Sequence, residues 1–297
     1  MSSYLEANAR ERLRRVFDAG SFEEFLPPSA RVISPHLAQL DAPVAFDDGV
    51  AVGTAKLAGH AVFVAAQEGG FMGGAVGEVH GAKLVGLLRR AISSRPRAVL
   101  LLLETGGVRL HEANAGLIAV SEVMRAVLDV RAAGIAVVVL IGGSNGAFGG
   151  MGIVARCANG IVMSEEGRLA MSGPEVIETA SGVEEFDSRD RALVWRTTGG
   201  KHRYLLGDVQ MIVPDSVAAF RQAALDLIDA CRLKGIELTL ETLEQEQQML
   251  GARIERFGAL ADPLDIWRAL GVEQVDAIPL LEIEQFLQVV QNLRVAS

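Results

Sequence analysis

The sequence predicts an α/β fold with a mainly parallel sheet, followed by a helical C-terminal extension. Between Gly70 and Asp215, short apolar runs of the kind that form buried strands alternate with stretches in which apolar residues recur at helical spacing. Glycine-rich turns separate them. After Asp215 almost every segment has helical spacing. Because half of the 297 residues are hydrophobic, the chain can bury a core large enough for one α/β domain and an appendage.

The N-terminal part is expected to contain one helix and one hairpin. In residues 4–19 the apolar side chains recur near helical spacing, and Gly20 is expected to end that helix. The stretch PPSARVISP is interpreted as a loop. Residues 50–66 alternate in short strand-like pieces around the turn signals DDG and LAGH, which predicts a hairpin or meander.

The central part is expected to supply the sheet and the helices that cover it. Buried strands are predicted for the runs RAVLLLLE, IAVVVLI, GIVMSE and DVQMIVPD, and helices for residues 80–93 and 115–133. We therefore divide the chain into an N-terminal helix and linker (1–47), an α/β core (48–235) and a helical C-terminal extension (236–297).

The charge balance and the cysteine count exclude several classes of function. With 28 Lys and Arg against 37 Asp and Glu, the formal charge is −9, which argues against a nucleic-acid or anionic-membrane surface. No apolar run approaches the ~20 residues that a membrane span needs, so we expect a cytoplasmic protein. Cys157 and Cys231 form no CxxC pair, and neither a disulfide framework nor a bound metal is expected.

The segment IGGSNGAFGGMG, residues 141–152, follows a predicted strand and leads into a helical stretch, which is the layout of an active-site turn. Its GGSNG formally matches the nucleophile elbow G-x-S-x-G. A serine hydrolase would then use Ser144, His202 and an acid such as Asp187 or Glu178. A phosphate-binding loop is not predicted, because the phosphate-loop and dinucleotide-binding glycine motifs do not occur in the required context. The third interpretation is a backbone oxyanion site.

Two glycine pairs support this third interpretation. Gly106-Gly107 and Gly149-Gly150 each follow a predicted strand and precede a helical stretch, the first of which is expected to begin near Val108. A glycine N–H can approach a ligand without a Cβ in the way, and the start of a helix favours negative charge. Two such turns could hold one or two oxyanions. The alternative is that both are simply strand exits in a crowded α/β core.

Five ordered segments give the chain a resemblance to a known family. They are ARERLRRVFDAGSFEEF (9–25), FMGGAVGEVHGAK (71–83), ETGGVRLHEA (104–113), the Gly149-Gly150 turn and MSGPEVIE (171–178). In this order they resemble the carboxyltransferase β subunits of acyl-CoA carboxylases over about residues 9–215. GGSNGAFGGMGI and KHRYLLGDVQMIVPD are most similar to the β subunit of biotin-independent malonate decarboxylase. The resemblance implies a crotonase-like (ClpP/crotonase) fold, which is a spiral of ββα units.

The resemblance also implies a chemistry. In that family a malonyl thioester on the phosphopantetheine-type arm of an acyl carrier protein loses CO2 and becomes an acetyl thioester. The reaction passes through an enolate whose oxygen backbone N–H groups stabilise. We expect Gly106 and Gly107 to form this oxyanion hole, and Gly149 and Gly150 to form a second hole or to orient the carboxylate. No cofactor bound by this chain is implied.

Further residues are candidates for substrate binding. Gly73 and Gly74 lie in the motif at 71–83. Arg109 is a candidate for carboxylate binding, and the alternative is a structural ion pair with Glu112. His80 is interpreted as an exposed or capping side chain. A small basic cluster in an otherwise acidic chain could meet the phosphates of the pantetheine arm or could be a solvated loop: Lys201, His202 and Arg203.

The partners that the resemblance implies are a homologous γ subunit, an acyl carrier protein subunit and a carrier-protein transferase subunit. The γ subunit is expected to form a heterodimer with this chain, with the active site at their interface. One alternative is the carboxyltransferase β subunit of a biotin-dependent acyl-CoA carboxylase or decarboxylase, although the four-cysteine zinc ribbon of the bacterial acetyl-CoA carboxylase subunit has no counterpart here. Another is a scaffold whose partner holds the chemistry.

Overall fold

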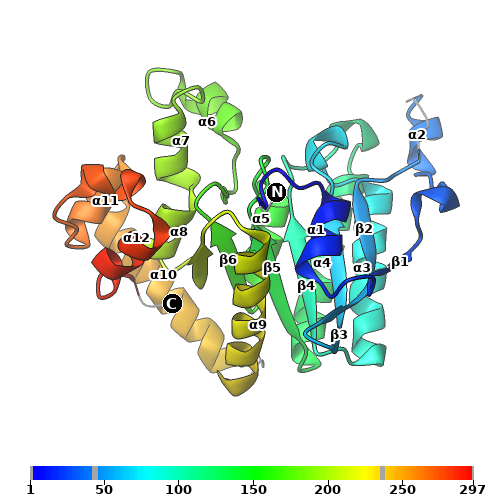
Figure 1. Cartoon of the computed structure of the whole chain (residues 1–297). Helices are drawn as coiled ribbons and strands as arrows, with labels where there is room; N and C mark the ends of the chain where they lie inside the picture. Colours follow the sequence, from blue (N-terminus) through cyan, green and yellow to red (C-terminus); the bar gives the residue numbers. More distant parts are fainter. Residues whose placement is uncertain (1–2, 42–45, 235–237, 296–297) are drawn as a thin grey trace.

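One mixed sheet organises the molecule. The computed structural model describes residues 3–41, 46–234 and 238–295, and the strands within them pair in the order of the chain (Figure 1). Strands β1 to β3 are antiparallel, and β3 to β7 are parallel. The predicted α/β fold with a mainly parallel sheet is confirmed. The strands are β1 (Glu23–Phe25), β2 (Val50–Leu57), β3 (His60–Gln67), β4 (Ala98–Leu103), β5 (Ala136–Ile141), β6 (Gly160–Ser164) and β7 (Met211–Val213).

The antiparallel part of the sheet is the predicted hairpin. β2 and β3 pair along their whole length, from Val50 opposite Gln67 to Leu57 opposite His60. The two residues between them, Ala58 and Gly59, both have positive φ, 49° and 80°. Positive φ at both central residues characterises the two-residue turn whose twist matches that of the flanking strands. The expected hairpin over 50–66 is therefore confirmed.

Helices cover both faces of the sheet because side chains alternate along each buried strand. In β4, Val99 and Leu101 belong to a core with α3 and α4, whereas Leu100 and Leu102 belong to a core with α1 and α9. Figure 1 shows α1 and α9 on the near face. The helices up to this point are α1 (Ala9–Val16), α2 (His36–Gln39), α3 (Glu78–Ser94), α4 (Ala115–Ala132), α5 (Gly150–Cys157), α6 (Pro174–Ser181), α7 (Arg191–Thr198), α8 (Gly200–Leu205) and α9 (Val217–Lys234).

Two predicted helices differ from the observed ones. The helix expected over 4–19 is only α1, because Asn8 caps its N-terminus in a capping box and Phe17 is extended. The helix expected from Val108 begins only at Ala115. Val108 forms a parallel bridge with Val76 instead, and Arg109 is also extended. The first glycine pair is therefore not at a helix start. Three short 3-10 turns complete this part: η1 (Pro28–Ala30), η2 (Met72–Gly74) and η3 (Leu110–Glu112).

Short extended segments beyond the main strands form a second layer of pairing. Thr105 and Leu169 each form a parallel bridge with Ala147, which lies between them. Val76 and Val108 form a further parallel bridge. Each unit thus contributes a long strand, a short extended piece and, in most cases, a helix. This is the repeated ββα arrangement that the sequence led us to expect.

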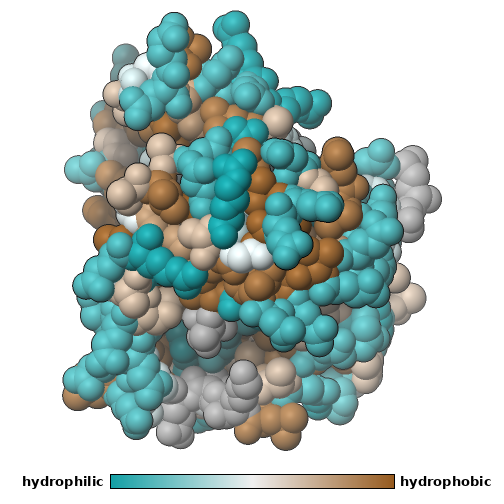
Figure 2. Space-filling view, turned by 90° about the vertical axis from the view of Figure 1, so that its left-hand side faces the viewer, coloured by the Kyte–Doolittle hydropathy of each residue, from teal (hydrophilic) through white to brown (hydrophobic). Residues whose placement is uncertain are grey.

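The C-terminal extension is helical, as predicted, and has its own apolar cluster. Phe257, Trp267 and Phe286 pack there with Leu205 of α8 and Ile212 of β7. A cavity of about 410 Å³ opens on this extension. Figure 2 views the molecule from that side and shows hydrophobic side chains gathered around a hollow. The division at residues 47 and 235 stays a prediction. The elements of the extension are α10 (Leu240–Phe257), α11 (Pro263–Ala269), the 3-10 turn η4 (Val275–Leu280) and α12 (Ile283–Val290).

Candidate active site

Three loops meet at one edge of the parallel sheet. They leave the carboxyl ends of β3, β4 and β5 on the same side because these strands are parallel. Gly106 N–H donates to the Gly73 carbonyl at 2.9 Å, and Thr105 N–H donates to the Gly146 carbonyl at 2.8 Å, so backbone hydrogen bonds join all three loops. The structure thus brings together the glycine pairs that the sequence singled out: Gly73-Gly74, Gly106-Gly107 and Gly149-Gly150.

The second and third pairs are in direct contact. Gly107 has φ 140° and Gly149 has φ 64°, both in the region that favours glycine. A Cβ atom on Gly149 would lie 3.2 Å from Gly107 Cα, so a side chain there would push the two turns apart. A Cβ atom on Gly107 would meet no atom within 4 Å. Gly107 therefore faces open space at the point where the two turns touch.

Two of the four amides in these pairs are already used. Gly106 N–H is held by the Gly73 carbonyl, and Gly149 N–H donates to the Met171 carbonyl at 2.9 Å. Both bonds have ordinary length and join the turn to a neighbouring loop. These two amides hold the turns in place and are not free to bind an anion.

The other two amides are available. Gly107 N–H donates to its neighbour Thr105 Oγ1 at 3.1 Å, a local hydrogen bond that a substrate oxygen can replace. Gly150 is the first residue of α5, and neither its N–H nor that of Met151 has an acceptor among the described residues. The first N–H groups of a helix have no partner within it and carry partial positive charge. The two touching turns therefore offer one available glycine donor each.

Arg109 is a structural residue beneath the turns. Its guanidinium donates to both oxygens of Asp47, at 2.7 and 3.1 Å, and to Glu112 at 3.4 Å. Burial raises the pKa of the Asp47 carboxyl, but the hydrogen bond and charge of Arg109 outweigh it, and the net pKa lies below its ordinary value. A guanidinium on a side chain that is 3% exposed, held by two carboxylates, is not available to a substrate carboxylate. The expected binding role is corrected, and the ion-pair alternative is confirmed.

His80 is neither exposed nor a cap. It lies in the first turns of α3 and is fully buried. Its Nε2 lies 3.0 Å from Gln67 Nε2, and the carbonyl oxygen of the same Gln67 amide accepts the N–H of Glu104 at 3.0 Å. Burial lowers the pKa of His80 to about 3, so the ring is neutral at physiological pH. Through Gln67, His80 therefore supports the ends of β3 and β4.

The basic cluster after α7 is also structural. Lys201 Nζ donates to Glu165 at 2.8 Å and to the carbonyls of Pro279 and Leu281 at 3.1 and 2.7 Å. Both interpretations made from the sequence, a phosphate contact and a solvated loop, are corrected: Lys201 is 6% exposed and His202 5%. Arg203 forms an ion pair with Asp208 at 3.2 Å. The local sequence is polar, as it would be in an exposed loop, but the C-terminal extension packs over these residues and buries Lys201 and His202.

The serine-hydrolase constellation is not assembled. Ser144 Oγ donates to Glu104 at 3.1 Å. The only downstream histidine, His202, is buried and accepts a hydrogen bond from Trp267 Nε1 at 3.1 Å. Burial lowers the pKa of His202 to about 3. Among the described residues, no hydrogen bond joins Ser144 to a base that could activate it.

Sequence reasoning missed Glu104 and Arg12. Glu104 directly follows β4 and is 5% exposed, and its carboxylate forms an ion pair with Arg12 of α1. The same carboxylate accepts from Ser144 Oγ and from Asn145 N–H, the latter at 3.3 Å. The sequence does contain a signal for Glu104: it is a lone acidic residue at the end of the all-apolar run AVLLLL. A carboxylate at the end of a buried strand needs a partner.

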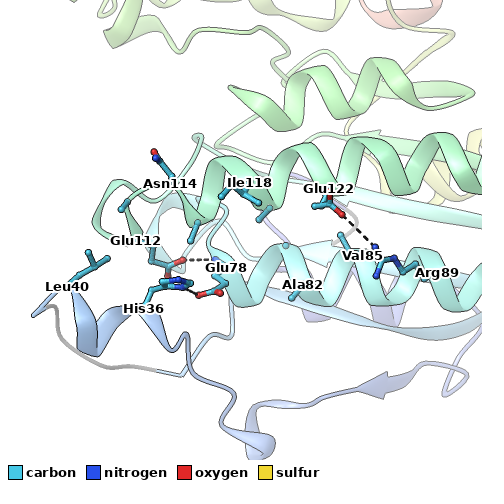
Figure 3. A pocket seen from close by; sticks show the side chains of 14 residues that line it. His36, Leu40, Glu78, Ala82, Val85, Arg89, Glu112, Asn114, Ile118 and Glu122 are labelled. Atoms are coloured by element: carbon cyan, nitrogen blue, oxygen red, sulfur yellow. Dashed lines mark hydrogen bonds and ion pairs between the residues drawn. The ribbon is translucent and has the colours of Figure 1, made fainter.

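Two cavities near the site do not coincide with the touching turns. One of about 490 Å³ lies between α3 and α4 (Figure 3), with an ion pair between Arg89 and Glu122 at one end and the His36–Glu78 pair near the other. Another, of about 320 Å³, lies next to the first turn and is lined in part by Met72. The turns themselves open to the surface. Large apolar side chains on the loops and helices around them are between 47% and 88% exposed: Met72, Leu110, Leu117, Ile118, Met171 and Val176.

Two further properties concern the described part of the chain. Within residues 3–41, 46–234 and 238–295, no group of three or more His, Cys, Asp or Glu side chains could hold a metal ion. None of the helices in these ranges has the length and apolar character to cross a membrane.

Comparisons with known proteins identify a family and several relatives of this chain. The carboxyl transferase domain family matches residues 6–212. The chain is 39% identical to the malonyl-S-ACP:biotin-protein carboxyltransferase of Malonomonas rubra, over 98% of this chain and 96% of that protein. The predicted resemblance to the carboxyltransferase and malonate decarboxylase β subunits is confirmed.

Two solved structures are similar as well. A chain of a Pseudomonas malonate decarboxylase hetero-tetramer in complex with malonate is 40% identical, with a TM-score of 0.75 and coverage of 84% of this chain and 91% of that one. A chain of a Pseudomonas malonate decarboxylase hetero-dimer is 36% identical, with a TM-score of 0.65 and coverage of 84% and 97%. The expected crotonase-like fold is confirmed.

Proposed function

Because the chain belongs to the carboxyl transferase domain family, we propose that it is a malonate decarboxylase subunit that removes CO2 from a malonyl thioester carried by an acyl carrier protein. The observation that carries this proposal is the contact between the two glycine turns. There, Gly150 N–H has no acceptor among the described residues, and Gly107 N–H is bound only to the Thr105 hydroxyl two residues before it. The relatives named above act on malonyl groups or are malonate decarboxylases.

The reaction needs such donors because it creates an enolate. The bond between the malonyl carboxylate carbon and the central carbon breaks, CO2 leaves, and the bonding electron pair moves into the thioester carbonyl. The carbonyl oxygen then carries nearly a full negative charge until a proton reaches the central carbon. We assign the stabilisation of this oxygen to Gly107 N–H, which would exchange Thr105 Oγ1 for the enolate oxygen. One preorganised donor of this kind contributes about 3–4 kcal/mol to the transition state.

The start of α5 suits a second anionic group. Gly150 N–H and Met151 N–H are the unpartnered first amides of this helix, and the helix dipole adds positive potential there. We propose that they orient the malonyl carboxylate or form a second oxyanion hole. Gly106 N–H and Gly149 N–H hold the turns and do not bind substrate in this scheme.

The open position of the turns favours a site that is completed by another subunit. The exposed apolar side chains around them would be covered by a partner of matching shape, and exposed apolar patches of this kind mark interaction surfaces. The similar solved structures are a hetero-dimer and a hetero-tetramer. We propose that a homologous γ subunit covers the turns, that a carrier-protein transferase subunit loads the carrier, and that the complex works in the cytoplasm without a cofactor on this chain.

A second candidate function differs only in the fate of the carboxyl group. The Malonomonas rubra relative is a biotin-protein carboxyltransferase, and such an enzyme would pass the carboxyl group to biotin on another protein. The test combines this chain with its partner subunit and malonyl-acyl carrier protein, and measures CO2 and acetyl thioester with and without avidin. We expect release that avidin does not affect. Turnover that requires a biotinylated protein would instead establish the carboxyltransferase.

A further inference from the structure

Glu104 occupies the point at which the three glycine loops meet. Its carboxylate is packed against backbone that has no side chain: a Cβ atom on Gly69 would lie 2.6 Å from it, and one on Gly143 would overlap it. Its own carbonyl lies against Gly74, where a Cβ atom would again overlap. Asn145 Nδ2 ties the outer two loops together by donating to the Gly69 carbonyl at 2.9 Å. Both glycine positions beside the carboxylate therefore have to stay small.

The carboxylate also holds the loop after β5 directly. Ser144 Oγ and Asn145 N–H donate to the same oxygen, Oε1, at 3.1 and 3.3 Å. The other oxygen, Oε2, pairs with Arg12. The two oxygens thus have different partners, and only Oε1 accepts hydrogen bonds from the loop that leads to Gly149 and Gly150.

Arg12 brings the N-terminal segment into the same arrangement. Its Nε donates to the Tyr4 carbonyl at 3.0 Å, and the guanidinium lies 4.6 Å from the centre of the Tyr4 ring. Tyr4 and Leu5 N–H groups both donate to Asp215 at 2.8 Å. The positive charge that balances Glu104 is therefore fixed by a segment that is anchored at Asp215, two residues after β7, and both charges are almost fully buried.

From these contacts we infer that Glu104 is a positioning residue: through Oε1 it sets the Gly149-Gly150 turn against the Gly106-Gly107 turn, which begins two residues after it. The positive charge of Arg12 stabilises the buried Glu104 carboxylate, but Arg12 does not itself contact either turn. The effect of Glu104 on turnover rests on the proposed function. Its effect on the position of the turns does not depend on that function.

The test uses two double variants that remove the same charges and differ in one acceptor. Arg12→Met/Glu104→Gln keeps an oxygen at the position of Oε1, and Arg12→Met/Glu104→Leu does not. Replacing a buried ion pair by neutral groups of similar volume is often neutral for stability. With the assembled complex and malonyl-acyl carrier protein, we expect the Gln variant to keep kcat within about threefold, and the Leu variant to lose tenfold or more in kcat with KM unchanged. Equal kcat for two equally stable variants would overturn the inference.

A second measurement works without activity. Amide hydrogen exchange of residues 142–150 should be at least tenfold faster in the Leu variant than in the Gln variant, while exchange in α3 stays the same. If wild-type complex releases no CO2, the proposed function fails, and this exchange still decides the positioning role. If neither double variant folds, Ser144→Ala alone must speed exchange in 142–150, and unchanged exchange would overturn the inference.

Asp18→Asn is the matched control. Arg221 of α9 donates to Asp18 at 2.6 Å, and Asp18 also accepts from Gly59 N–H in the β2–β3 turn at 2.8 Å. These contacts tie the residues after α1 to the core, and none of them involves the three glycine pairs of the site. We expect wild-type kcat and wild-type exchange in 142–150 from this variant. A loss of kcat as large as that of the Leu variant would mean that loosening the N-terminal segment is sufficient, and that Glu104 has no particular role.

Discussion

Replacing Gly107 with Val tests the oxyanion hole most directly. Gly107 has φ 140°, a conformation that a β-branched residue rarely adopts, so the variant strains the backbone by about 1–3 kcal/mol. The Cβ atom of the new side chain meets no atom within 4 Å in the folded chain. This strain is smaller than the 5–15 kcal/mol of stability that is typical of a domain. The protein should therefore fold, with the side chain in the space that the thioester oxygen needs.

The expected effect on turnover is much larger than the effect on stability. Losing one oxyanion donor costs about 3–4 kcal/mol in the transition state, which is a fall of roughly 100- to 1000-fold in kcat. Thermal unfolding and gel filtration with the partner establish that the variant is intact, and CO2 release from malonyl-acyl carrier protein measures turnover. Gly107→Val should retain assembly and lose activity.

Gly59→Val provides the matched control. Gly59 also has positive φ, 80°, and open space around a Cβ atom, but it lies in the turn between β2 and β3, at the opposite end of β3 from the loop that holds Gly73. It should lose a similar amount of stability and keep its activity. Near-wild-type decarboxylation by a well-folded Gly107→Val protein would refute the assignment and leave Gly150 as the remaining donor.

Four other outcomes are expected. Ser144→Ala should lower turnover less than about tenfold, because it removes one of the hydrogen bonds to Glu104 and no nucleophile; an acyl-serine adduct in mass spectrometry would contradict this. Both His80 and His202 have a folded-state pKa of about 3 against 6.5 unfolded, so the stability they support is present above pH 6.5 and is lost as pH falls towards 3. Between pH 7 and 5 each histidine lowers the free energy of unfolding by about 2 kcal/mol. Denaturant unfolding of a His202→Gln variant at several pH values should therefore show a free energy of unfolding that depends less on pH. Lys201→Met should destabilise by about 2 kcal/mol without raising KM for the carrier-bound substrate, whereas a raised KM in a stable protein would restore its phosphate-binding role. Chelator treatment should leave activity and fold intact, and stoichiometric zinc in the purified protein would show otherwise.

The local features of this protein follow from its sequence. Runs such as AVLLLL and AVVVLI form buried parallel strands because every residue in them suits burial on both faces of a sheet. The hairpin over 50–67 follows from alternation around a turn. The helical extension follows from spacing alone. Glycine pairs in the loops that follow two strands were enough to single out the loops that meet at the sheet edge, since the ends of parallel strands lie on one side.

Which amides can act was decided by tertiary structure. The four glycines of the two touching pairs look alike in the sequence, but Gly73 takes the N–H of Gly106 and Met171 takes that of Gly149. These acceptors come from other loops, at distances along the chain that no local pattern encodes. The result is one available glycine donor on each turn rather than two.

The same reason explains the charged residues. Arg109, His80 and Lys201 are polar groups in polar local sequence, and periodicity predicts that such groups are exposed. Each is buried because its partner comes from a distant segment: Asp47 for Arg109, Gln67 for His80, and the carbonyls of the C-terminal extension for Lys201. Glu104 and Arg12, 92 positions apart, meet only when α1 packs on the sheet. A sequence states which groups need partners, whereas the fold alone determines which partners arrive, because burial makes an unpaired charge too costly to leave.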